Sequence, residues 1–171
     1  MTFLLFVYRH QQIIAEKSRI NLRLDNLRQK LMDLQSYAAS VADGKVTMSD
    51  LMQAPPSMFG QMSLFMMSSS QQAYAGANEK FMQMRAMGGI QQMQDQQTQQ
   101  MYNNVVFKAL FDQQREGFGE QEKKRLNVED TKIQQEVAKL EDQLKMLDAT
   151  DTKVTEQESK AAEKGAPSFM A

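Results

Sequence analysis

The chain has 171 residues, with no cysteine, no tryptophan, one histidine and a formal net charge of −1. This composition excludes disulfide frameworks, thiolate zinc sites and cysteine nucleophiles. It also argues against nucleic-acid binding, because phosphate recognition needs a clear excess of basic side chains. The charges are unevenly placed: residues 1–45 carry a net +3, residues 108–171 a net −3, and residues 46–107 only five charged side chains.

Residues 1–45 are predicted to form an N-terminal arm containing one helix near residues 3–42. Apolar residues recur there at alternating spacings of three and four, with charged residues between them, as in a coiled coil. We call these recurring positions the seam, and His10, Lys17, Ala38 and Val41 occupy it as well. The seam residues expected to contact another helix are Phe3, Phe6, Ile13, Ile20, Leu24, Leu27, Leu31 and Leu34.

The apolar start of this arm, Phe3 to Val7, is compared with a signal peptide and with a membrane anchor. It lacks a basic region before it and a small-residue cleavage site after it, so no signal peptide is expected. It is too short to cross a bilayer, and the seam runs through Phe3 and Phe6 without a break. Docking against protein is therefore preferred to a membrane contact, and the expected location is cytoplasmic by default.

Residues 46–116 are predicted to form a helical hairpin rich in methionine and glutamine. Residues 46–107, which we call the charge-poor block, hold eleven of the fifteen methionines. A capped turn is expected at Thr47 to Asp50, then helices near 57–86 and 90–116 separated by Gly88-Gly89. Residues 58–67 are apolar on more than one face, so part of this segment should remain available for binding. The expected contact residues are Met58, Met62, Phe65 and Met66.

Residues 117–164 are predicted to form a C-terminal arm, with a helix near 120–162 after a break at Gly117-Phe118-Gly119. Its seam runs from Leu126 to Val154 and includes Asp130 and Asp151. Residues 165–171, with Pro167, are expected to form a disordered tail. The seam residues expected to make contacts are Ile133, Val137, Leu140, Leu144 and Leu147.

Together these elements predict an all-α fold, either a helical bundle or an elongated helical hairpin. The hairpin in the middle brings the chain back along itself, and the two arms carry opposite net charge. We therefore expect the N-terminal and C-terminal arms to pack antiparallel as a coiled coil.

The sequence shows no constellation typical of an enzyme. His10 has no nucleophile beside it and is read as a helix-pairing residue, and Lys17 as a residue that sets the register. The methionine clusters could ligate Cu(I) but are better explained as core side chains. The glycine pairs lack the strand and the Lys-Ser/Thr of a phosphate loop. No catalytic residue, metal or cofactor is therefore expected.

Two functions remain open from the sequence. The first is a structural or scaffolding protein that self-associates, or binds a helical protein, through the arms and the charge-poor block. The alternative is a membrane-active protein, or an exported subunit of the filament or translocator kind, whose Met/Phe-rich middle contacts a bilayer. The expected partner is a second copy or a helical protein, with no nucleic acid and with membrane contact not favoured.

Overall fold

The computed structural model describes residues 2–41 and 45–165, and within these ranges it contains helices and no strand. The elements are α1 (Thr2–Ser40), α2 (Met48–Met52), α3 (Pro56–Ala86) and α4 (Gln96–Gly165). The predicted all-α fold is confirmed. The chain divides into two compact units, unit 1 (residues 1–31 and 131–171) and unit 2 (residues 32–130).

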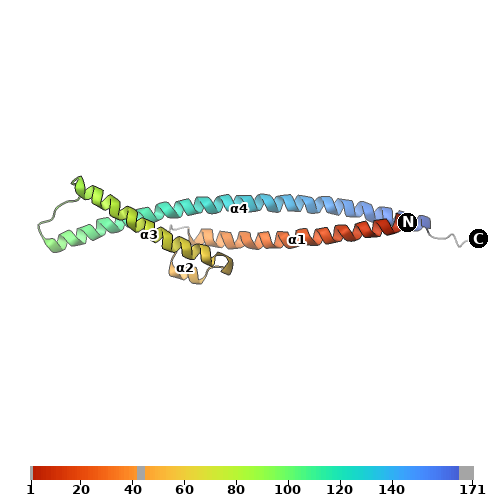
Figure 1. The fold of residues 1–171 in the computed structure, drawn as a ribbon, viewed down its shortest axis with the longest axis horizontal. Helices are drawn as coiled ribbons and strands as arrows, with labels where there is room; N and C mark the ends of the chain where they lie inside the picture. Colours follow the sequence, from red (N-terminus) through yellow and green to blue (C-terminus); the bar gives the residue numbers. More distant parts are fainter. Residues whose placement is uncertain (1, 42–44, 166–171) are drawn as a thin grey trace, which may run out of the picture. The chain divides into compact units, whose positions relative to one another are not determined.

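Unit 1 is a pair of antiparallel helical segments. Figure 1 shows the red and orange part of α1 alongside the blue part of α4. Lys17 of α1 reaches Asp151 of α4, whereas Arg23, further along α1, pairs with Glu136, which comes earlier in α4. The predicted antiparallel packing of the two arms is therefore confirmed within this unit.

Unit 2 combines the end of α1 with α2, α3 and the first part of α4. The hydroxyl of Ser57, at the start of α3, donates a hydrogen bond to Asp33 of α1. Further along, the Tyr74 ring of α3 meets Phe107 of α4, so these two helices pack against each other. The buried apolar side chains of this unit are Leu34, Tyr37, Val41, Val46, Leu51, Met58, Met62, Ala73, Ala77 and Leu126.

The turns between the helices follow the local sequence. Thr47 caps α2, because its hydroxyl accepts a hydrogen bond from the Asp50 amide while the Asp50 carboxylate accepts one from the Thr47 amide. Pro56 occupies the first position of α3, where its missing amide proton costs nothing. Gly88 follows the C-terminal end of α3 and has a φ of 70°, a backbone conformation that residues with a side chain rarely adopt.

The predicted break at Gly117-Phe118-Gly119 is wrong, because α4 runs through it as one helix of 70 residues. The helix that was expected to start at residue 90 instead begins at Gln96. Two glycines cost a helix roughly 1 kcal/mol each relative to alanine. That penalty is outweighed here by uninterrupted helical hydrogen bonding and by packing, since Gly119 is itself buried.

Parts of two predictions lie outside the described residues. Residue 42, the expected end of the first predicted helix, falls in the gap at 42–44, and α1 ends at Ser40. The expected disordered tail at 165–171 likewise lies outside them, apart from Gly165, which is the last residue of α4. Within the described residues, none of the helices combines the length and apolarity that crossing a membrane requires.

Gly117→Ala should stabilise the protein by about 1 kcal/mol, because this glycine is helical and exposed and an added Cβ would meet nothing within 4 Å. Gly88→Ala is the control: its surroundings are equally open, but its positive φ makes alanine unfavourable there, so it should destabilise by about 1 kcal/mol. Urea unfolding measures both. A loss of stability for Gly117→Ala would contradict a continuous α4.

Candidate interaction surfaces

The seam of unit 1 lies between its two helical segments. Every seam position there with a described side chain is buried or half-buried, which confirms the predicted register. The Phe3 side chain lies outside the described ones. These residues pack inside the unit, so a contact with a second chain stays a prediction. Ile13, Leu24, Ile133, Leu140 and Val154 are buried, and Phe6, Ile20, Leu27, Leu31, Val137, Leu144 and Leu147 are half-buried.

A polar cluster interrupts this apolar seam. Lys17 Nζ lies 2.6 Å from Asp151 Oδ2 and 2.8 Å from Asp148 Oδ1. His10 Nδ1 lies 2.8 Å from Asp151 Oδ1. The hydrogen bonds to Asp148 and Asp151 raise the pKa of Lys17, and the bond from Lys17 lowers the pKa of Asp151. Both partners of the Lys17–Asp151 pair are therefore held in their charged forms, and a shifted helix register would separate them.

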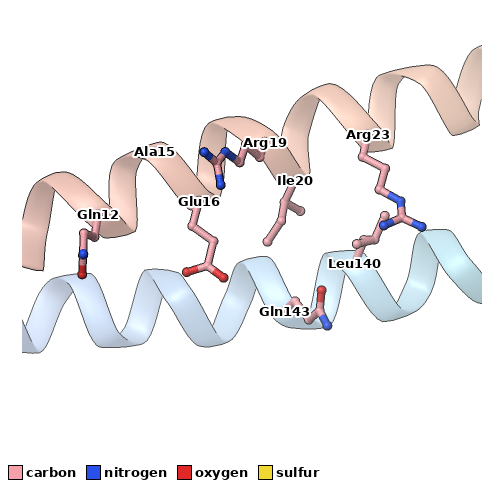
Figure 2. Close-up of a pocket in the computed structure, with 8 residues that line it drawn as sticks. All are labelled: Gln12, Ala15, Glu16, Arg19, Ile20, Arg23, Leu140 and Gln143. Atoms are coloured by element: carbon pink, nitrogen blue, oxygen red, sulfur yellow. The ribbon is translucent and has the colours of Figure 1, made fainter.

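Open grooves flank the helix pair in unit 1. Figure 2 shows one of them, where Glu16 and Ile20 of α1 point toward α4. Gln12, Ala15, Arg19, Arg23, Leu140 and Gln143 complete its lining. These eight side chains include no nucleophile paired with a base.

Tyr37 forms the buried polar contact of unit 2. Its hydroxyl donates a 2.9 Å hydrogen bond to Glu122 Oε1, and the same carboxylate accepts hydrogen bonds from Nε and Nη2 of Arg125. Burial raises the pKa of Tyr37, and the Glu122 carboxylate adds to the shift. The hydrogen bonds from Arg125 lower the pKa of Glu122. Tyr37 is not among the residues predicted from the sequence, although its spacing of three after Leu34 and four before Val41 matches the seam.

One face of α3 packs into the core of unit 2. Met58 and Met62, two of the expected contact residues, are only 4% and 0% exposed, so they are core residues in this structure. Phe65 and Met66, the other two, are half-buried. Small residues continue the same face at Ser69, Ala73 and Ala77, which allows a close approach of neighbouring helices. The expectation that Met58 and Met62 offer a binding surface therefore needs correction.

The opposite face of α3 is exposed and largely apolar. Leu64 is 73% exposed, Met67 62%, Tyr74 61% and Met82 55%. Gly60, Gln71, Asn78 and Arg85 complete the row at spacings of three and four, and all are exposed. We call these eight positions the α3 stripe. The predicted second apolar face of residues 58–67 is thus present, but its exposed members are Phe59, Leu64 and Met67.

Aromatic side chains join the edge of the α3 stripe to α4 within unit 2. The ring of Phe107 lies edge-on to Tyr74 at 5.3 Å and to Phe81 at 6.0 Å between centroids. Further along α4, the guanidinium of Arg115 stands 5.7 Å from the centre of the Phe111 ring. The two ring contacts of Phe107 hold α3 against α4, whereas the contact of Arg115 with Phe111 lies within α4.

A metal centre has no donor set in the described part of the chain. No group of three or more His, Asp or Glu side chains is placed there so that it could hold an ion. The cluster at His10 belongs to the ion pairs of unit 1, and the methionines of α3 divide between a core face and an exposed face. The candidate site is the α3 stripe, because its four large apolar side chains are more than half exposed.

Leu24→Ala should destabilise the protein by about 2–5 kcal/mol, because Leu24 is 3% exposed in the seam of unit 1. Leu22→Ala is the matched control, since Leu22 lies two residues earlier in the same helix and is 65% exposed. Its expected cost is below about 1 kcal/mol. Equal losses for the two variants in urea unfolding would show that the register is wrong.

Stability should fall as the pH rises above about 10, the pKa of a tyrosine in the unfolded chain. The pKa of Tyr37 is raised in the folded protein, so the neutral phenol stabilises the fold fully below that pH and progressively less above it. The free energy of unfolding, measured from pH 8 to 11, should fall more steeply for the wild type than for Tyr37→Phe. Parallel curves would contradict this role of Tyr37.

The chain was compared with protein-family models, with curated proteins and with solved structures, and no match was found. The function of the chain is therefore inferred from its own contacts, burial and charge.

Proposed function

We propose that the chain is a non-enzymatic structural or scaffolding protein that self-associates through the exposed apolar side chains of its charge-poor block. The observation that carries this proposal is the α3 stripe, in which four large apolar side chains are more than half exposed while the other face of the same helix is buried. Exposed apolar surface gathered on one face of a helix often marks a contact with a protein or a membrane.

The packing of the two units supports an assembly role. In unit 1 the heptad-spaced seam is covered by the paired helix, so its large apolar residues already have partners. In unit 2 the core face of α3 is likewise covered, whereas the stripe is exposed and Tyr74 alone among its four large apolar side chains has a ring contact, with Phe107, in the described structure. Unit 1 then serves as an antiparallel coiled coil that keeps α1 and α4 folded, and the α3 stripe is the surface that binds.

The charges of α3 favour a protein over a membrane as the bound surface. Helices that lie in a bilayer interface usually carry several lysines or arginines on their polar face. In α3 the charged residues are Glu79, Lys80 and Arg85, and the two cations lie near its C-terminal end. Most of the stripe therefore has no cation beside it to attract lipid headgroups.

Changing Leu64, Met67 and Met82 together to Gln should abolish self-association, because the three substitutions remove three of the four large apolar side chains of the α3 stripe. Light scattering coupled to size exclusion should give a mass that rises above 19.6 kDa with concentration for the wild type and stays near it for the variant. The matched control changes Leu22, Met32 and Met146 to Gln. These three residues are of the same types as those in the test variant, are 64–65% exposed, and lie outside the charge-poor block. It should behave as the wild type.

A wild type that stays monomeric at every concentration would contradict self-association. Flotation of the intact protein with liposomes of neutral and of anionic lipids would then test the membrane alternative. Loss of self-association in both triple variants would show that exposed apolar surface in general, rather than the α3 stripe, drives the assembly.

A further inference from the structure

We propose that two copies of the chain pair antiparallel along their α3 stripes, with Met67 of each copy opposite Gln71 of the other. This inference rests on the proposed function, because it gives the self-association a defined surface, occupant and direction. Its evidence is the spacing, charge and size pattern of the stripe.

The spacing of the stripe matches what a second helix requires. Successive members are separated by four, three, four, three, four, four and three residues, and all eight positions are exposed. This repeat keeps one narrow row of side chains facing a partner helix along its whole length. The row runs from Gly60 to Arg85, which is about 39 Å of helix at ~1.5 Å per residue. A partner helix of similar length would therefore cover it.

The charge pattern selects a second copy as that partner. Arg85 is the one charged member of the stripe, so the surface offers little to an acidic or a basic macromolecule. Burial of the stripe against a charged helix would leave the charges of that helix without partners, which is costly. The α3 stripe of another copy has the same near absence of charge. In the proposed register residues 60–78 of the two stripes face each other and Arg85 lies beyond them, so no charge is buried unpaired.

The sizes of the side chains favour the antiparallel direction. With Met67 opposite Gln71, Leu64 lies opposite Tyr74 of the second copy and Gly60 lies opposite Asn78. A parallel pair would instead set Gly60 against Gly60, where the contact loses a side chain on both helices. It would also bring the two Arg85 guanidinium groups into one layer, whereas the antiparallel pair separates them. The antiparallel direction also places the N-terminal end of each α3 helix, which carries a partial positive charge, toward the partially negative C-terminal end of the other, which is favourable.

The area of the contact predicts a weak dimer. The overlap of residues 60–78 is about 27 Å long and, at a width of about 10 Å, covers on the order of 270 Å² on each copy. Stable interfaces bury about 800 Å² on each partner. The pair should therefore dissociate on dilution, with half-association at micromolar or higher concentration.

Cysteine crosslinking tests the pairing, because the chain has no cysteine of its own. Single variants are treated with a short bismaleimide at a concentration where the wild type is associated. Met67→Cys should crosslink with itself, since the two sites lie about 6 Å apart along the pair. Gly60→Cys should not, because its two sites are about 27 Å apart. An equal mixture of Gly60→Cys and Asn78→Cys should give several-fold more dimer than either variant alone.

Met146→Cys is the control for random collision, because Met146 is 64% exposed and lies outside the stripe. Self-linking of Gly60→Cys as strong as that of Met67→Cys, with no gain from the mixture, would indicate a parallel pair and overturn the proposal. Oligomers in light scattering without crosslinks above the Met146→Cys level would reject the pairing through α3 and leave self-association standing. A monomeric wild type would reject both.

Discussion

The fold depends on burial of the apolar seam between helix segments that are far apart in the sequence. A fully buried Leu or Ile side chain contributes about 1.5–3 kcal/mol, whereas an exposed ion pair contributes about 0.2–1 kcal/mol. Arg28 and Glu141, joined by a 2.8 Å hydrogen bond in unit 1, are both more than 40% exposed. Such pairs can favour one alignment, but the seam supplies most of the stability. The cluster at Lys17 has a different role, because a register shift would leave its charges partly buried and unpaired.

The seam could be predicted from the sequence because its spacing is a property of the helix itself and repeats over many turns. That spacing located the half-buried Asp151 as well as the buried Leu24 and Leu140. The continuity of α4 could not be predicted in the same way. The low helix propensity of glycine is a local effect that costs about 1 kcal/mol relative to alanine. The helix on both sides of Gly117 outweighs this cost.

The candidate site was located only at the level of a segment. Residues 58–67 are apolar on several faces, so periodicity predicts that part of them is exposed without showing which part. The structure buries Met62 beside a row of small residues and exposes Leu64. The small Ala73 and Ala77 decide which face packs inward, because large residues there would hold neighbouring helices apart. The face of a helix that packs inward thus depends on the sizes of its side chains as well as on their hydrophobicity.

The two units differ in how their chain segments meet during folding. Unit 2 is one continuous stretch, residues 32–130, so its contacts close comparatively short loops. Unit 1 joins segments on either side of that stretch, and its helices can pair only after about 100 intervening residues have been spanned. Contacts between distant segments slow folding. Prior folding of unit 2 would shorten the effective loop, so unit 1 is expected to form last and to be the first part to open when the protein unfolds.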